Sequence, residues 1–347
     1  MRGLRYILAL IALVAAPVLM QAGRGGGSAA GQAAEETEMD MQEYIFGHIG
    51  DSYEWHITTI KGKSIAIPLP CIVIDGGIHV FSSEKMEEHG YTLNDAGKIV
   101  NASTGKRPFD ISITKNVLGL MFDSALLVVL ILLCARWYRR HDVLNEPPSG
   151  IAALFEPVIM MINDDVIKDA VGPEHERFAP YLLTAFFFIL INNLMGIFPV
   201  FPGGANITGN IAVTMVLAVF TFLMVNLFGN KHYYKEIFWP DVPLFLKVIP
   251  IMPIIEIIGT LTKPFSLMVR LFANMLAGHI MLLSAIAVIF LTANMAPAIN
   301  GSLTVLSALF GVFLDCLEVL VACIQAYVFT MLSAVFIGLA HQTPETE

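Results

Sequence analysis

Hydrophobic residues fill most of the chain from about residue 113 onwards, in runs long enough to cross a lipid bilayer. These runs cover about 116–136, 178–199, 210–229, 250–293 and 302–340. A helix needs roughly 20 apolar residues to span the hydrocarbon core of a membrane, so the pattern predicts five transmembrane helices. Residues 150–171 are amphipathic and interrupted by Pro157, which predicts a helix that lies along the membrane surface instead.

The last two hydrophobic runs are too long for simple crossings. About 40 helical residues extend ~60 Å, which is about twice the thickness of the hydrocarbon core. Pro253 and the Lys263-Pro264 pair predict bends in the first of these helices. The pattern therefore predicts a long, tilted helical hairpin, a shape suited to lying against a curved partner.

The N-terminal third has a different pattern. Residues 1–22 contain Arg2 and Arg5, then the apolar run Ile7–Leu19, then small or polar residues; this order is typical of a secretory signal peptide. The apolar run is short for a crossing, which favours a cleaved signal over a retained anchor. Residues 23–37 are rich in Gly and Ala and predict a flexible linker.

Residues 38–112 are polar and acidic, and their apolar positions alternate. The runs Trp55–Ile60 and Lys63–Leu69 predict strands, and Asp75-Gly-Gly77 ahead of Ile78–Phe81 predicts a hairpin turn. We therefore expect a small β-rich module, followed by a membrane domain over 113–342 and a short tail over 343–347. The spacing of His48, Asp51 and His56 matches no strong metal motif, so we expect no metal and no cofactor.

Basic residues orient the membrane domain. The cluster Arg136-Trp-Tyr-Arg-Arg140 and the lysines Lys231, Lys235 and Lys247 mark cytoplasmic segments, whereas the loops 201–209 and 294–301 contain no Lys or Arg. Five crossings then place the N-terminal module outside the cell membrane and the C-terminal tail in the cytoplasm. The predicted signal peptide gives the same orientation independently.

Composition excludes several classes of protein. The chain is 56% hydrophobic and 14% charged, with a mean hydropathy of +0.70, which excludes a soluble globular protein. A net charge of -9 argues against nucleic-acid binding. The four cysteines show no C-x-x-C spacing, and we expect Cys134, Cys316 and Cys323 to be buried apolar residues of the spans, without disulfides.

Arg270 is the most informative single residue because it lies in the middle of an apolar run. A guanidinium at bilayer depth costs several kcal/mol and cannot escape by losing its proton. A charge kept at such a place predicts a function, against a carboxylate or along an ion path.

The other polar residues of the hairpin can be placed by helical geometry. Arg270 and Asn274 share a face, and His279 lies nine residues further on, ~13.5 Å along the axis. Glu318 and Gln325 are seven residues apart on the returning helix. If Gln325 is level with Arg270, then His279 and Glu318 fall at nearly the same depth.

Further groups extend this column of polar side chains. Asp315 lies one turn beyond Glu318, on the outward side, while Ser266 and Glu256 lie about one and four turns from Arg270 on the inward side. The column thus has titratable groups on both sides of a fixed cation.

These residues carry a resemblance to a known family. The run Ser266-Leu-Met-Val-Arg-Leu-Phe-Ala-Asn-Met-Leu-Ala-Gly-His279, with Glu256 and Lys263-Pro264 before it and Gln325-Ala-Tyr-Val-Phe after it, closely resembles subunit a of the F-type ATP synthase. The resemblance covers about 113–342; Glu156-Pro-Val, Asn193-Leu-Met and Asn210…Thr214 are similar to other family elements. Gly196 and Ala212 depart from the family pattern, and residues 23–112 lie outside it.

The resemblance implies an all-α polytopic protein of the bacterial inner membrane, without a catalytic site of its own. In the family, subunit a lies beside the rotating c-ring, is held by the peripheral stalk b subunits and contacts membrane lipid. It supplies two offset half-channels for the proton; the sequence leaves Na+ open, because the ion-binding carboxylate belongs to the ring. The implied roles are Arg270 with Asn274 and Gln325 against that carboxylate, His279 and Glu318 in the outer path, and Glu256 and Ser266 in the cytoplasmic path. Helical spacing adds Asp315 as a further candidate for proton translocation on the outer side.

Other interpretations remain open for single residues and for the whole chain. His279 and Glu318 could be a static ion pair, Asn274 and Gln325 could hold two helices together, and Asp315 could be a solvated helix end. A secondary ion transporter of the inner membrane also places charges at the midplane, but it usually has internal repeats or paired broken helices, and this sequence has neither. No H-E-x-x-H or G-x-S-x-G motif indicates a membrane hydrolase.

Overall fold

The computed structural model describes residues 50–60, 63–94, 97–142, 146–198, 203–238, 251–291 and 297–341. The expected signal peptide, the linker and the C-terminal tail lie outside these residues, so those expectations stay predictions. The described residues form two compact units. The first unit contains the described parts of 50–122, 194–207 and 276–319, and the second unit those of 123–193, 208–275 and 320–341.

The N-terminal part of the first unit is the predicted β-rich module. Strands β1 (Glu54–Ile60) and β2 (Lys63–Pro68) pair antiparallel, as do β5 (Tyr91–Leu93) and β6 (Ile99–Asn101). The central sheet has the order β4-β3-β7, with β3 at Pro70–Ile74, β4 at Ile78–Ser82 and β7 at Phe109–Asp110. Two short helices, η1 (Ser83–Lys85) and η2 (Glu87–His89), follow β4.

The predicted hairpin turn is confirmed. The Asp75 N–H donates to the Gly77 carbonyl oxygen at 3.0 Å, and Gly76 has a φ of 67°. This left-handed backbone conformation is accessible to glycine at little cost, whereas a side chain would strain it. The turn sets the register of β3 and β4, in which Cys71 lies opposite Phe81 and Val73 opposite His79.

Alternation along these strands gives the module a small core of its own. Its members are Tyr53, Cys71, Val73, Phe81, Met86, Tyr91 and Ile99. At the edge of this core the Tyr53 hydroxyl donates to Asp110 Oδ2 at 2.5 Å. Burial and this bond raise the pKa of Tyr53. Burial acts to raise the pKa of Asp110 as well, but hydrogen bonds from Ser112 and Tyr53 outweigh it and lower that pKa overall.

Long helices follow the module, as predicted. They are α3 (Lys115–Arg140), α6 (His175–Ile197), α7 (Ile211–Phe228), α10 (Ile251–Leu291) and α11 (Pro297–His341). Five described stretches are long and apolar enough to cross a membrane, each overlapping one of these helices. Mean hydropathy within these spans reaches 1.7 to 2.7. The predicted five-helix membrane domain is therefore confirmed.

The amphipathic stretch between α3 and α6 is helical as well. It forms α4 (Ile151–Met160), the wider π-helical segment η3 (Met161–Lys168), α5 (Asp169–Val171) and the short turn η4 (Gly172–Glu174). One face of η3 buries Ile162, Val166 and Ile167. Its location at the membrane surface stays a prediction. A last short helix, α8 (Lys231–Phe238), follows α7.

The second unit packs around one hydrophobic core. Helix α6 contributes Phe178, Leu182 and Ile189, and α11 contributes Phe329 and Ile337, all with at most 1% of their surface exposed. Polar contacts join the same helices, since Tyr181 and Ser333 both lie within hydrogen-bonding distance of the Thr221 hydroxyl on α7. The same core includes Leu267 and Leu271 of α10 and Ala326 of α11, so it also positions the helix segments that carry Arg270 and Gln325.

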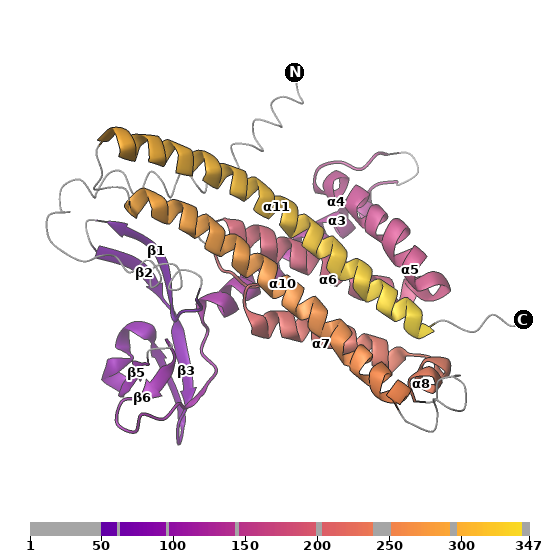
Figure 1. The fold of residues 1–347 in the computed structure, drawn as a ribbon, viewed down its shortest axis with the longest axis horizontal. Helices are drawn as coiled ribbons and strands as arrows, with labels where there is room; N and C mark the ends of the chain where they lie inside the picture. Colours follow the sequence, from indigo (N-terminus) through magenta and orange to yellow (C-terminus); the bar gives the residue numbers. More distant parts are fainter. Residues whose placement is uncertain are drawn as a thin grey trace, which may run out of the picture. The chain divides into compact units, whose positions relative to one another are not determined.

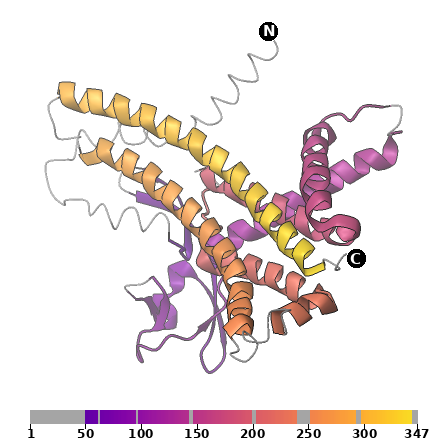
Figure 2. The same ribbon diagram turned by 45° about the vertical axis from the view of Figure 1, so that its right-hand side comes forward.

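Helices α10 and α11 run side by side in both ribbon views (Figure 1; Figure 2). α10 is 41 residues long and stays helical through Pro264, although a proline removes one backbone hydrogen bond. The two helices are the predicted long hairpin.

The expectation that the cysteines of the spans are buried is correct for Cys134 and wrong for Cys316 and Cys323, which are exposed. The two exposed thiols lie on a side of α11 that also exposes Phe313, Leu317 and Leu320. Lipid tails are as apolar as the protein interior, so an apolar side chain of a membrane helix gains nothing by facing the protein instead of the lipid. Hydrophobicity alone therefore does not predict burial at these positions.

Candidate functional site

The polar side chains of the hairpin form two groups, one in each unit. In the second unit, Asn274 Nδ2 on α10 donates to Gln325 Oε1 on α11 at 2.8 Å. Gln325 is buried, with 3% of its surface exposed. The sequence-based placement assumed that Gln325 is level with Arg270; in the structure Gln325 pairs with Asn274, the residue four positions further along α10. The amide pair satisfies a buried polar group that would otherwise be unpaired, which fixes this register.

Arg270 is exposed on the surface of α10. It belongs to a polar stripe, Thr262, Ser266, Arg270 and Asn274, whose members are spaced by four residues and are all exposed. Large apolar side chains flank this stripe: Leu261, Phe265 and Val269 are 64%, 59% and 39% exposed. Within the described residues no carboxylate lies within 4.0 Å of the guanidinium. The arrangement presents a permanent cation, framed by apolar side chains, to whatever lies against this face.

The first unit contains the second group. His279 Nδ1 on α10 lies 2.9 Å from Glu318 Oε1 on α11, and these side chains are only 13% and 5% exposed. The prediction that His279 and Glu318 fall at the same depth is confirmed. A buried imidazole and carboxylate in contact can share one proton between them, since each stabilises the charged form of the other.

A glycine makes this contact possible. A Cβ added at Gly278 would lie 3.0 Å from Glu318 Oε1 and 3.4 Å from Glu318 Cδ. Helices approach closely in membranes where one of them has a small residue. Gly278 therefore leaves the space in which the Glu318 carboxylate reaches His279.

Asp315 lies one turn from Glu318 on α11 and is fully buried, with 0% of its surface exposed. Of the two alternatives that the sequence left open, the solvated helix end is thus wrong. Neither carboxyl oxygen of Asp315 has a hydrogen-bond partner among the residues described. Asp315 and the His279–Glu318 pair together give the first unit three titratable side chains at membrane depth.

Glu256 and Ser266 occupy α10 on the other side of Arg270. Glu256 is half-buried and Ser266 is exposed. In the second unit, a cavity of ≈ 10 Å³ lies near this end of α10, lined by Thr221, Phe222, Val225, Asn226, Tyr233, Thr260, Lys263, Pro264 and Phe336. A volume of this size holds about one water molecule. Burial raises the pKa of the Tyr233 phenol at this cavity, while the Thr260 hydroxyl acts in the opposite direction.

Sequence reasoning missed these cavity residues. Thr260 could have been found, because it lies four residues after Glu256 and so shares its helix face. Asn226 and Tyr233 could not have been found from the sequence, because only the packing of α7 and α8 against α10 brings them to this cavity. Asp123 on α3 has no partner that the sequence indicates and is expected to face protein or the outer interface; the structure buries it, with 2% of its surface exposed.

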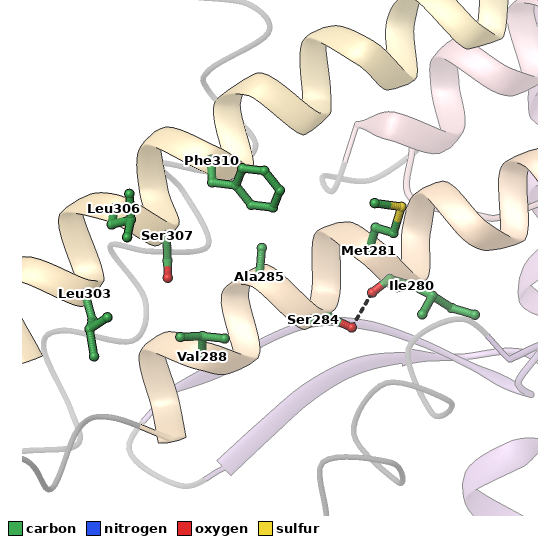
Figure 3. Close-up of a pocket in the computed structure, with 9 residues that line it drawn as sticks. All are labelled: Ile280, Met281, Ser284, Ala285, Val288, Leu303, Leu306, Ser307 and Phe310. Atoms are coloured by element: carbon green, nitrogen blue, oxygen red, sulfur yellow. Dashed lines mark hydrogen bonds between the residues drawn. The ribbon is translucent and has the colours of Figure 1, made fainter.

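A groove of a different character lies between α10 and α11 beyond the His279–Glu318 pair (Figure 3). It has a volume of ≈ 560 Å³, and its lining is Ile280, Met281, Ser284, Ala285, Val288, Leu303, Leu306, Ser307 and Phe310. Side chains from the two helices face each other across it. The Ser284 hydroxyl donates to the Ile280 carbonyl oxygen at 2.6 Å. This groove is almost wholly apolar and offers no titratable group.

Comparison with known proteins matches this hairpin and the rest of the membrane domain to one family. The family model described as ATP synthase A chain matches residues 121–338, more than half of the chain. The chain belongs to the ATP synthase A chain family. This family comprises the proton-translocating stator subunit of the F-type ATP synthase.

Relatives in bacteria share this membrane domain. ATP synthase subunit a 2 of Chlorobaculum tepidum is 43% identical over 241 residues, 67% of this chain and 64% of that protein. ATP synthase subunit a 2 of Prosthecochloris aestuarii is 43% identical over 250 residues, 69% of this chain and 72% of its own. ATP synthase subunit a of Myxococcus xanthus is 40% identical over 237 residues, 67% and 73% of the two chains. This chain thus matches just under two thirds of the length of the Chlorobaculum protein.

The N-terminal module matches a different family. Residues 44–117 match a domain of unknown function (DUF8433), and this match ends before the match of the membrane domain begins at residue 121.

Proposed function

We propose that this chain is the stator subunit a of an F-type ATP synthase and conducts protons through two offset half-channels beside the c-ring. The observation that carries the proposal is Arg270, an exposed cation in an apolar frame on a helix long enough to cross the membrane. Removing a guanidinium from water is costly unless an anion pairs with it. A carboxylate on a neighbouring subunit would form that pair, and a rotating ring would bring one carboxylate after another to Arg270.

The proposed outer path uses the first unit. A proton entering from outside reaches the His279–Glu318 pair, with Asp315 as a further acceptor one turn away on α11. The 2.9 Å contact between the pair supports proton sharing, because each partner can hold the proton that the other releases. The proton then passes to a ring carboxylate. That carboxylate becomes neutral and can rotate into lipid without the penalty of a buried charge.

The proposed cytoplasmic path uses the other end of α10. After nearly a full turn of the ring, the protonated carboxyl group meets Ser266 and Glu256 and releases its proton toward the cytoplasm. The small cavity whose lining includes Asn226, Tyr233 and Thr260 supports this assignment, because it places hydroxyl and amide groups beside the same stretch of α10. Lys263 also lines this cavity and would keep the local potential positive.

Arg270 separates the two paths in this proposal. Its guanidinium attracts the ring carboxylate once that group has lost its proton, and its fixed charge repels a proton moving directly between the half-channels. Asn274 and Gln325 bond to each other at 2.8 Å and hold α10 and α11 in register beside the arginine. The transmembrane potential supplies ~2.3 kcal/mol per charge per 100 mV. Because protons cannot pass directly between the two half-channels, this energy drives rotation of the ring.

The remaining partners and the orientation follow from the same proposal. The peripheral stalk b subunits would hold the chain against the torque, and lipid would cover its apolar faces away from the ring. Arg139 and Arg140 end α3, and basic residues of this kind favour the cytoplasmic side. The N-terminal module then lies outside the bacterial inner membrane, and the C-terminus lies in the cytoplasm.

Replacing the arginine tests the proposal. Arg270→Ala in the assembled complex should abolish ATP-driven proton pumping into membrane vesicles, with ATP synthesis lost as well, while the amount of assembled complex is unchanged. Thr262→Ala on the same exposed stripe is the matched control and should pump nearly as the parent does. Assembled Arg270→Ala complexes that pump normally would refute the central role of this residue.

A further inference from the structure

Asp123 is a buried carboxylate that the proposed path does not use. Helix α3 has one buried face, formed by Asn116, Gly119, Asp123, Leu127 and Cys134 at intervals of three, four or seven residues. Its other faces expose large apolar side chains such as Met121 (57%) and Val128 (56%). Asp123 therefore points into the protein, with 2% of its surface exposed. The opposite orientation, with the carboxylate facing lipid, would be energetically costly.

Neighbouring contacts bracket the position of Asp123 along α3. One turn before it, a Cβ on Gly119 would lie 2.7 Å from Ala205 Cβ and 3.4 Å from Ile207 Cδ1. One turn after it, Leu127 is buried in the hydrophobic core of the second unit. On the other side, Ile207 leads directly into Thr208, whose hydroxyl bonds to Asn193 at the C-terminal end of α6.

That end of α6 is polar inside the second unit. Asn192 and Asn193 are 1% and 0% exposed, and Thr208, also 1% exposed, donates its hydroxyl to Asn193 Oδ1 at 2.6 Å. Asn192 Oδ1, Asn193 Nδ2 and Asp123 Oδ1 have no hydrogen-bond partner within the described ranges. Buried polar groups of a stable core are almost always paired. A layer that keeps an acceptor, a donor and a titratable carboxyl group unpaired has the properties of a proton path rather than of a packed core.

We propose that Asp123 is a protonatable group of the outer half-channel, working with Asn192, Asn193 and Thr208 to take up protons from the outer side. The proposal rests on the proposed function and adds an entry residue on α3 to it. In the transfer, the Asp123 carboxylate accepts a proton from hydronium on the outer side, which leaves as water, and becomes a neutral carboxylic acid. It then gives the same proton to the next acceptor on the path and returns to the carboxylate. No other bond changes.

The first experiment separates titration from packing at this position. Asp123→Asn keeps the size and hydrogen-bonding capacity of the side chain but cannot carry a proton, and it should slow ATP-driven proton pumping per assembled complex about tenfold. Asp123→Glu should restore most of the rate. Cys134→Ala, on the same buried face, is the structural control and should leave pumping unchanged.

Each outcome of this comparison is decisive. Equal pumping by Asp123→Asn and the parent overturns the proposal, as does an equal loss in the Asn and Glu variants. Arg270→Ala measured in the same vesicles separates the two claims: if it still blocks pumping while Asp123→Asn does not, only the role of Asp123 is wrong. If Arg270→Ala pumps normally, the proposed function itself fails.

A second measurement tests access rather than rate and remains informative if Asp123→Asn assembles poorly. With the four native cysteines replaced, Asp123→Cys should be inhibited by Ag+ during pumping, because silver reacts with a thiolate that forms only where water and protons reach it. Met121→Cys and Val128→Cys, on the exposed apolar faces of α3, should be insensitive. Equal sensitivity at all three positions, or none at Asp123→Cys, would overturn the assignment.

Discussion

At the scale of single residues, the His279–Glu318 pair shows how a membrane protein can hold a mobile proton. Both side chains are nearly buried and lie 2.9 Å apart. A charge alone at this depth is expensive, whereas a pair that shares one proton stays close to neutral in either arrangement. The pair is therefore suited to receive a proton and pass it on.

The first prediction concerns coupling within this pair. His279→Ala and Glu318→Ala should each cut proton flux severely, and the double variant should lose little more than the worse single one. The coupling in the activation free energy should exceed about 1 kcal/mol, as expected for residues in direct contact. The exchange variant, His279→Glu with Glu318→His, should retain more flux than the worse single variant. Simply additive losses in the cycle would mean that the two residues act separately.

A second prediction at this scale lies outside the membrane, at Tyr53 and Asp110. The hydrogen bond from Tyr53 helps to lower the pKa of Asp110. A carboxylate whose pKa is lowered by folding stabilises the folded form above its unfolded pKa, and this contribution is lost as the pH falls through the folded value. Tyr53→Phe should therefore destabilise the module by about 1 kcal/mol at neutral pH.

The effect of Tyr53→Phe should shrink as the pH falls below about 4, the unfolded pKa of an aspartate. Protease resistance of the module against urea, measured on the full chain in vesicles at several pH values, gives the comparison. Thr92→Ala, on the exposed side of β5, is the control. An effect that stays constant down to pH 3 would argue against the ionised hydrogen bond.

At the scale of elements, the proposed function depends on how closely α10 and α11 approach each other. Gly278 leaves only 3.0 Å between an added Cβ and Glu318 Oε1, whereas an added Cβ on Gly259, also on α10, meets no atom within 4 Å. The two glycines thus occupy one helix in opposite environments. One is part of the site, and the other is not.

The third prediction follows from this difference. Gly278→Val should push the Glu318 carboxylate away from His279, because the end of a flexible side chain moves more easily than two helices. Pumping should fall to the level of Glu318→Ala, with Gly278→Ala between the two. Gly259→Val should pump like the parent, and assembly should be unchanged in all of them. Normal flux in Gly278→Val would show that the contact can be broken without consequence.

The elements also show what the sequence could predict. Long apolar runs gave all five membrane helices, and Asp75-Gly-Gly77 gave the hairpin turn, because both depend on local physics. The nine residues from Arg270 to His279 and the seven residues from Glu318 to Gln325 correspond to fixed distances along a helix axis. These distances predicted that His279 and Glu318 lie at the same depth. The hydrogen bond between Asn274 and Gln325 was not predicted, because spacing along one helix does not show which side chain of the other helix is its partner. Cys316 and Cys323 were assigned to the interior wrongly, because lipid and protein interior are equally apolar.

Asp123 marks the limit of such reasoning. Helical spacing puts it on one face with Gly119 and Leu127, and a carboxylate in an apolar run is expected to face protein or the outer interface. The sequence does not indicate which groups of other helices surround it, because these come together only through tertiary packing. The same holds for Asn226 and Tyr233, which reach α10 through the packing of separate helices.

At the scale of the whole molecule, the chain combines a small β-rich module with an apolar helical membrane domain. The module has its own core of seven buried residues and its own strand pairings. It matches one family over 44–117, while the membrane domain matches another over 121–338. No titratable group of the proposed path lies in the module. We therefore expect the path to function without it.

The last prediction removes the module. Deleting residues 38–105, while keeping the signal segment and α3, should leave measurable ATP-driven pumping in complexes that assemble, because Arg270, the His279–Glu318 pair and Glu256 all remain. Pumping should still be abolished by adding Arg270→Ala to the deletion, which controls for passive leakage. The exposed apolar side chains on the outer face of the central sheet, Ile78 (73%), Val80 (63%) and Phe109 (68%), fit contact with another protein. Loss of assembly would agree with such a contact, whereas an assembled but proton-impermeable deletion variant would place the module within the conduction path.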